Sequence, residues 1–154
     1  MANEKQAGDR EKPGLVDDGL EGLTYKVIGM AMAVHNDLGP GHREATYHSA
    51  MHQRYLDAEL PAEREPELPI YDENGNFVNH YVPDHRIDRL LVEYKAHFYP
   101  LNNDEVAQCI DYLAASEEHH VVLLFNFGRR RLEWKRIFPP EKVSDHRRKN
   151  WKHP

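Results

Sequence analysis

Residues 81–96 read YVPDHRIDRLLVEYKA, and the rest of the chain is organised around this stretch. Its pattern is that of a strand end, a short polar turn and a second strand that begins at Leu90. Side chains two residues apart point to the same face of a strand, so we expect Glu93 and Lys95 side by side. The turn returns the chain alongside itself and brings Asp84 toward them. Charged residues that continue a buried apolar run cost free energy unless they are paired or bind a metal, so we expect chemistry here.

The composition is that of one globular domain, with 154 residues, 40% apolar and 30% charged. No apolar run approaches the roughly 18 residues of a membrane-spanning helix, and the polar N-terminus lacks the apolar region of a signal peptide. The single cysteine, Cys109, excludes an intrachain disulfide and fits an apolar helical face in the core. We therefore expect a cytoplasmic protein with no membrane association.

The charge is unevenly distributed along the chain. Residues 23–128 carry seventeen acids and seven bases, whereas residues 129–154 carry ten bases and three acids. An acidic body is a poor electrostatic match for a polyanion unless cations bind to it or the basic end makes the contacts. This distribution argues mildly against a nucleic-acid substrate.

Hydrophobic periodicity predicts an α/β domain with a mixed sheet. The second helix should bury Tyr47, Met51 and Tyr55, with Glu44 on the same side. We expect a disordered N-terminal tail (1–20), one domain (21–140) and a basic polar C-terminal tail (141–154). The expected helices are 23–38, 43–59 and 104–116, and the expected strands are 68–71, 77–82, 90–95, 121–125 and 131–138.

Two short motifs occur in the order that one known family shows. The segment Gly41–Tyr47, GHREATY, resembles the pattern that names the GxxExxY family. Asp84, Glu93 and Lys95 resemble the D…ExK signature of the PD-(D/E)XK nuclease superfamily, to which that family is similar. The resemblance covers roughly residues 23–138. It implies a restriction-endonuclease-like core, a mixed β-sheet flanked by helices, and a site formed by the following residues: Glu44, Asp84, Glu93, Lys95 and, in support, Gln108.

The chain also departs from the family pattern. Tyr94 stands where an aliphatic residue is expected between the Glu and the Lys, and Glu105 stands where a His is expected, three residues before Gln108. These departures concern helper positions rather than the D…ExK triplet.

The chemistry that the resemblance implies is metal-assisted hydrolysis of a phosphodiester. Mg²⁺ is usually held by one or two carboxylates and several waters, which Asp84 and Glu93 could provide, with Glu44 as a third metal-side carboxylate. Mn²⁺ would serve in the same way. Lys95 could position the attacking water or stabilise developing negative charge.

Each of these residues also has a purely structural interpretation. Glu93 and Lys95 could form an ordinary ion pair, with Asp84 as a turn residue after Pro83. Glu44 could be a carboxylate favoured by the helix dipole in a first turn, and Gln108 an exposed helical residue. A rival constellation is Glu44, His48 and His52, whose spacing resembles that of a zinc site on one helix.

The cluster Arg129, Arg130 and Arg131, followed by Trp134, could hold phosphates and stack a base. It could equally be a solvated turn that protects an edge strand from aggregation. We treat these three arginines as candidate substrate contacts.

The sequence leads to two main hypotheses, beside a weaker third, a metal-binding protein that uses the histidines of the second helix. The first is a Mg²⁺- or Mn²⁺-dependent phosphodiesterase acting on DNA or RNA, and it requires Asp84, Glu93 and Lys95 to lie within one hydrogen-bond network. The second is a non-catalytic binding or assembly module that keeps the nuclease-like fold. A domain this small offers little surface for gripping a duplex, so a homodimer is also considered.

Overall fold

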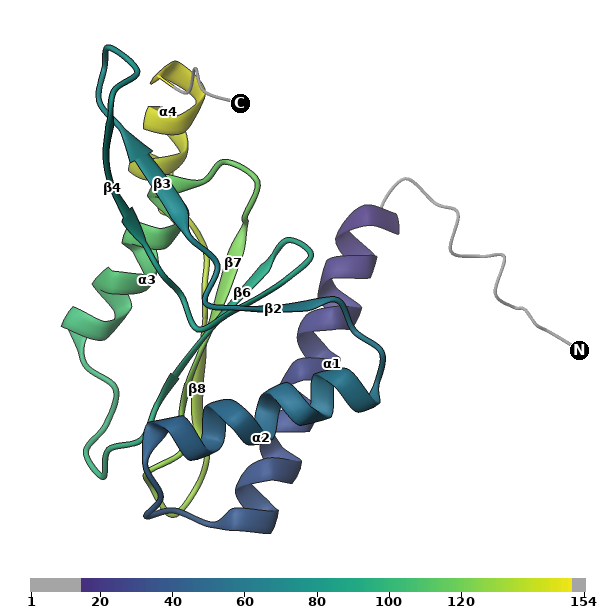
Figure 1. The fold of residues 1–154 in the computed structure, drawn as a ribbon. Helices are drawn as coiled ribbons and strands as arrows, with labels where there is room; N and C mark the ends of the chain where they lie inside the picture. The colour runs from purple at the N-terminus through teal and green to yellow at the C-terminus, as the bar shows by residue number, and fades with distance from the viewer. Residues whose placement is uncertain (1–14, 151–154) are drawn as a thin grey trace, which may run out of the picture.

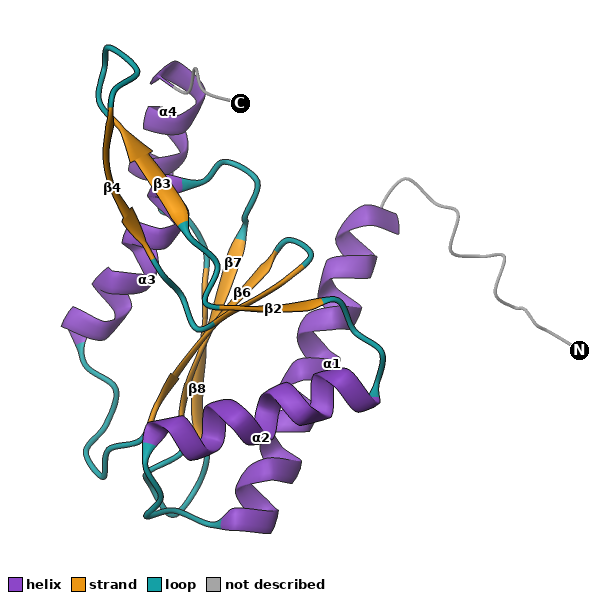
Figure 2. Ribbon diagram, in the orientation of Figure 1, coloured by secondary structure: helices purple, strands orange, loops and turns teal. Residues whose placement is uncertain are grey.

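The computed structural model describes residues 15–150 and shows a twisted five-stranded sheet with helices on both faces (Figures 1 and 2). The strand order is β2-β5-β6-β7-β8, and β3 and β4 form a separate hairpin. The pair β6 and β7 is parallel and is connected through α3, whereas the other pairs are antiparallel. The predicted α/β class with a mixed sheet is confirmed.

The helices are α1 Leu15–Leu38, α2 Glu44–Asp57, α3 Asn103–Ala115 and α4 Glu141–Asn150. The strands are β2 Ala62–Arg64, β3 Leu68–Tyr71, β4 Phe77–Tyr81, β5 His85–Ile87, β6 Leu90–Lys95, β7 Val121–Asn126 and β8 Glu133–Ile137.

The two faces of the sheet support two separate hydrophobic clusters. Helices α1 and α2 cover one face, and α3 and the β3–β4 hairpin cover the other (Figure 1). Strand β6 contributes Leu90, Val92 and Tyr94 to the first cluster and Leu91 to the second. This alternation is the period of two that a strand imposes. It places Glu93 and Lys95 on the α3 face, as their spacing predicts.

The helices near the site begin for identifiable reasons. Gly39 and Gly41 have φ of +71° and +105°, values that glycine adopts without steric cost, and α2 begins at Glu44. Its buried residues are Tyr47, Met51 and Tyr55, as predicted. Helix α3 begins with a capping box in which Asn102 and Glu105 each accept a hydrogen bond from the other's backbone N–H.

Four stretches differ from the expected elements. Helix α1 begins at Leu15, so residues 15–20 of the predicted tail are helical, and residues 1–14 lie outside the described part. Residues 141–150 form α4 rather than a loose tail, and residues 151–154 also lie outside it. The expected connection 61–69 contains β2. The expected polar turn 85–89 contains β5, which pairs with β6. Short polar segments like these lack the apolar periodicity on which the predictions rested.

Cys109 is buried in α3, as expected. Within residues 15–150, none of the helices combines the length and the apolar character that crossing a membrane requires.

Candidate active site

Glu93 is the most constrained carboxylate of the site. It is only 6% exposed, in the middle of the sheet. Its Oε1 accepts hydrogen bonds from the backbone N–H of Asp84 and from the hydroxyl of Tyr112, both at 3.2 Å. Burial, with the negative charge of Asp84 as the second cause, raises the pKa of Glu93 to about 8. Both causes would be relieved by a cation bound beside the two carboxylates.

Lys95 lies beside Glu93 at the end of β6. Its Nζ is 3.6 Å from Oε2 of Glu93 and donates to Oε1 of Gln108 at 3.1 Å. Gln108 is therefore a half-buried residue of α3 that faces the site, not an exposed helical glutamine. One helical turn further along α3, Tyr112 contacts Glu93, so both positions of the i, i+4 pair face β6.

Asp84 lies immediately before β5 and is held from several sides. Its Oδ2 accepts from the backbone N–H of Tyr94 at 2.8 Å, and its carbonyl oxygen accepts from Nε2 of His48 at 3.2 Å. Burial raises the pKa of Asp84, while the bond from Tyr94 and the charges of His48 and Lys95 oppose that rise. A hydrogen bond thus joins Asp84 to Glu93 and an ion pair joins Glu93 to Lys95, so the three residues form the connected group that the first hypothesis requires.

Glu44 approaches the site from the start of α2. Although the residue as a whole is exposed, partial burial of its carboxyl group raises its pKa, and the charge of Asp84 adds to the rise. Lys95 and His97 act on the same carboxyl in the opposite direction, so Glu44 lies within the electrostatic reach of the site. An open pocket of about 390 Å³ joins it to Asp84 and is lined by Glu44, Ala45, His48, Ser49, Arg64, Glu65 and Asp84.

The predicted set of three metal-side carboxylates is not preassembled. In the described part of the chain, no group of three or more His, Cys, Asp or Glu side chains is positioned to hold a metal ion. Asp84 and Glu93 alone suit Mg²⁺ or Mn²⁺ in the mode in which two carboxylates hold a cation that keeps several waters. Glu44 comes from α2, in a different layer of the fold, and shares a pocket with Asp84.

The rival zinc constellation on α2 does not form. His48 Nε2 donates to the carbonyl of Asp84, and His52 Nδ1 lies 2.9 Å from Nε2 of His85. His85 is buried, which lowers its pKa to about 3, and its other ring nitrogen lies 3.0 Å from the hydroxyl of Tyr94. The histidines of α2 therefore serve the packing and hydrogen bonding around Asp84 and β5.

The two departures from the family pattern have structural explanations. Tyr94 points away from Glu93 into the α1–α2 face, where its hydroxyl lies 2.6 Å from that of Tyr55. Glu105 caps α3, and its Oε2 lies 2.5 Å from Nε2 of His97, just beyond Lys95. An acidic residue at position 105 thus pairs with a histidine supplied by the neighbouring loop.

The three arginines lie in the turn between β7 and β8, at the same end of the sheet as Lys95 (Figure 1). Residue Phe127, just before this turn, donates its backbone N–H to the carbonyl of Lys95 at 2.8 Å. The carbonyl of Arg129 accepts from His35 of α1 at 2.8 Å, and the guanidinium of Arg129 lies 3.6 Å from Glu133. Trp134 faces Arg136 instead, with the cation 5.9 Å from the ring centroid.

Some contacts of the site were missed in the sequence, although a signal was present. His48 stands four residues after Glu44 on α2, the spacing that places both on one helix face, yet this pair suggested only zinc. The loop 96–102 carried no motif at all. The hydrogen bonds of Asn126 attach this loop to the end of β7, and sequence alone does not reveal that attachment.

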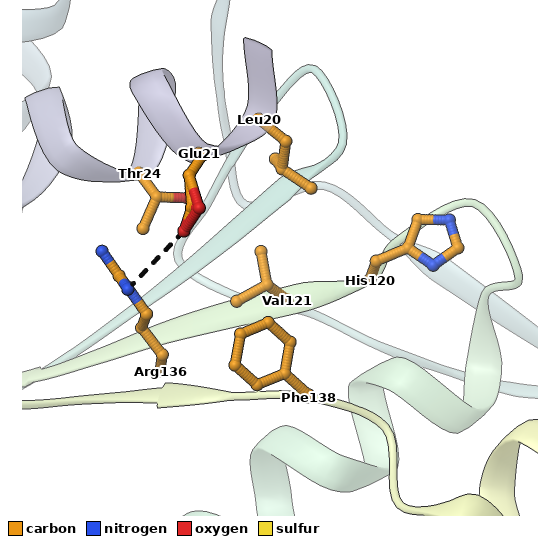
Figure 3. A pocket seen from close by; sticks show the side chains of 7 residues that line it. All are labelled: Leu20, Glu21, Thr24, His120, Val121, Arg136 and Phe138. Atoms are coloured by element: carbon orange, nitrogen blue, oxygen red, sulfur yellow. Dashed lines mark ion pairs between the residues drawn. The ribbon is translucent and has the colours of Figure 1, made fainter. Parts of the chain in front are cut away.

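A more apolar pocket of about 220 Å³ lies at the opposite end of β7 (Figure 3). Val121 and Phe138 line it, and the ion pair between Glu21 and Arg136, at 3.8 Å, borders it. None of the predicted site residues lines this pocket.

Comparison with known proteins places the chain in a family. The model of the PD-(D/E)XK nuclease superfamily matches residues 21–137, a range that contains every predicted site residue. No curated protein and no solved structure matches the chain. The match covers about three quarters of the sequence and agrees with the mixed sheet flanked by helices. The chain belongs to the PD-(D/E)XK nuclease superfamily.

Proposed function

We propose that this protein is a metal-dependent phosphodiesterase that hydrolyses nucleic acid, with Glu44, Asp84, Glu93 and Lys95 as its functional residues and Gln108 in support. The observation that carries the proposal is the network of Asp84, Glu93 and Lys95, in which a buried carboxylate with a raised pKa adjoins a second carboxylate and a cation. Perturbed pairs of this kind are concentrated at functional sites.

Asp84 and Glu93 would hold Mg²⁺ or Mn²⁺, which neutralises charge on phosphoryl oxygens and activates water when bound. Lys95 is positioned by Gln108 so that its ammonium can hold a water for attack on phosphorus or stabilise the negative charge that develops there. In the proposed reaction the oxygen of water forms the new P–O bond, the bond to the leaving sugar oxygen breaks, and the proton that the water loses ends on that sugar oxygen. Arg129, Arg130 and Arg131 would contact phosphates of the strand beyond the site.

We further propose that the chain belongs to the GxxExxY branch. Gly41 adopts a φ of +105°, and the hydroxyl of Tyr47 donates to the carbonyl of Gly39 at 2.5 Å. The backbone N–H of His42 donates to the same hydroxyl at 3.2 Å. The glycine and the tyrosine together fix the turn that presents Glu44, which gives the motif a physical reason. The cytoplasmic location, the homodimer and the three-part division of the chain remain predictions.

The test is a cleavage panel of duplex DNA, single-stranded DNA and single-stranded RNA, each with Mg²⁺, Mn²⁺ or chelator. Wild type should cut at least one substrate with either metal and none with chelator. Asp84→Ala should lose at least about 100-fold in rate, because one of the two carboxylates that would hold the cation is gone. Asp57→Ala, an exposed carboxylate at the end of α2, is the matched control and should cut like wild type.

The outcomes separate the two hypotheses. Cutting that persists in chelator, or in Asp84→Ala at the wild-type rate, contradicts the proposed site. A well-folded wild type that cuts nothing and gives no heat on titration with either metal supports the non-catalytic binding or assembly module instead.

A further inference from the structure

The loop that follows Lys95 presents two aromatic side chains to solvent. Phe98 is 84% exposed and Tyr99 is 47% exposed. A single exposed apolar residue is ordinary on a protein surface. Phe98 lies only three residues beyond Lys95, however, and its ring contacts Tyr99 edge-on, with centroids 5.8 Å apart and planes at 81°.

This loop is fixed to the framework of the site. The backbone N–H of His97 donates to Oδ1 of Asn126 at 3.1 Å, and Nδ2 of Asn126 donates to the carbonyl of Tyr99 at 3.0 Å. The rings of His97 and Tyr99 stack with centroids 3.8 Å apart and planes at 2°. Nε2 of His97 also contacts Glu105 of α3. An exposed ring held on so constrained a loop is preorganised for a partner, since little conformational entropy remains to be lost on binding.

The loop also adjoins the cationic turn between β7 and β8. Asn126, which holds the loop, precedes that turn, and Gly128 packs directly against the backbone of His97, where an added Cβ would lie 2.4 Å from the carbonyl oxygen. Residues 129–131, which follow at once, are the three arginines. The loop after β6 and the turn between β7 and β8 therefore lie at the same end of the sheet, next to Lys95 (Figure 1).

We propose that Phe98 is a stacking platform for an unpaired base, so that the substrate class of the site is single-stranded nucleic acid, DNA or RNA. The inference rests on the proposed function and specifies its substrate. Bases offer their faces to protein side chains when they are unpaired, while in a duplex those faces are covered by neighbouring bases. Phosphates of the same strand match the charge of the adjacent arginines. Tyr99 and His97 support the Phe98 ring rather than bind the base.

The test is equilibrium binding of the full chain to fluorescent oligonucleotides of one sequence, as single-stranded DNA, single-stranded RNA and duplex DNA, with chelator present to prevent cutting. Phe98→Ala should weaken binding of the single strands by about 5-fold or more, since stacking on an aromatic side chain contributes about that factor per base. Phe98→Trp should restore it. The affinity of Phe98→Ala for duplex DNA should differ from that of wild type by less than about twofold. The comparison of the DNA and RNA strands identifies the preferred sugar.

Phe77→Ala is the matched control, because Phe77 is also a large exposed ring, 60% accessible, but lies on the β3–β4 hairpin. It should bind single strands like wild type. A single strand with 2-aminopurine should show fluorescence quenching with wild type that Phe98→Ala abolishes.

The result separates this inference from the proposed function. Metal-dependent cutting with unchanged single-strand binding in Phe98→Ala overturns the stacking role alone. If single strands bind through Phe98 but nothing is cut, the proposed phosphodiesterase activity is contradicted, while the preference for single-stranded nucleic acid is supported. No binding of either single strand by wild type, or equal losses for duplex and single strands in Phe98→Ala, overturns the inference.

Discussion

At the scale of single residues, the site depends on a carboxylate placed where burial opposes its charge. Glu93 continues an apolar strand, and its neighbours Tyr112 and Asp84 donate to it without supplying a positive charge. Lys95, at 3.6 Å, compensates only in part, because the pKa of Glu93 stays at about 8. Without a bound cation, the buried charge of such a group destabilises the folded state.

The pH dependence of stability should reveal this cost. The folded state holds the Glu93 proton more tightly than the unfolded state, so its contribution to stability is full below pH 4.5 and is lost as the pH rises to about 8. Glu93→Gln removes that loss. In chelator, its Tm should exceed that of wild type by at least about 3 °C at pH 8 and by little at pH 4.5, since 1 kcal/mol moves the Tm of such a domain by about 2–4 °C.

Glu73→Gln, at an exposed position of the β3–β4 turn, is the control and should show no pH-dependent difference. An equal change in Tm at both pH values for Glu93→Gln, or a loss of stability at pH 8, would contradict the raised pKa.

At the scale of elements, the sequence predicted those segments whose pattern is strong. Tyr47, Met51 and Tyr55 mark the buried face of α2, and the Asn74-Gly75 turn marks the β3–β4 hairpin. The start of α1 was missed because Gly19 and Gly22 interrupt its period, and α4 because its residues are almost all polar. Strand β2 has three residues that pair with β5, and such a short edge strand leaves no periodic signal.

The junction between β7 and the loop after β6 should be sensitive to added volume. A Cβ at residue 128 would lie 2.4 Å from the backbone carbonyl oxygen of His97 and 2.5 Å from its backbone nitrogen. Gly128→Ala should therefore destabilise the fold by about 1–3 kcal/mol in urea unfolding, because backbone must shift to admit it.

Gly29→Ala is the matched control, since Gly29 lies within α1 and an added Cβ there meets nothing within 4 Å. It should stabilise by roughly 0.5–1 kcal/mol through helix propensity. Equal stability of Gly128→Ala and wild type would show that the loop is not packed as described.

At the scale of the whole molecule, the site exists because the fold brings distant segments to one end of the sheet. The alternation of β6 and the short separation of Glu93 from Lys95 were predictable from sequence. Gln108 and Glu44 were predicted as site residues from the family pattern alone. In the structure Gln108 accepts a hydrogen bond from Lys95, and the charge of Lys95 acts to lower the pKa of Glu44. The aromatic loop and its attachment through Asn126 were not predictable, since nothing in the local sequence links residues 97 and 126.

The distribution of charge over the whole molecule bears on the proposed polyanionic substrate. The acidic residues dominate the body, while ten bases and three acids occupy residues 129–154. Three of those bases, Arg129, Arg130 and Arg131, lie in the β7–β8 turn, which follows the backbone contact between Phe127 and Lys95. A cation between Asp84 and Glu93 would remove repulsion at the point where a phosphate must approach.

The most direct measurement is the initial rate of Mg²⁺-dependent strand cleavage by Lys95→Ala relative to wild type, at matched Tm. Lys95→Ala keeps both carboxylates and the aromatic loop, so it tests the ammonium group alone. We predict a loss of at least about 100-fold, because a donor aimed at the reacting centre is removed, while Lys135→Ala, an exposed lysine of β8, retains the wild-type rate. Cleavage by Lys95→Ala at the wild-type rate would contradict the assignment of this network as the active site.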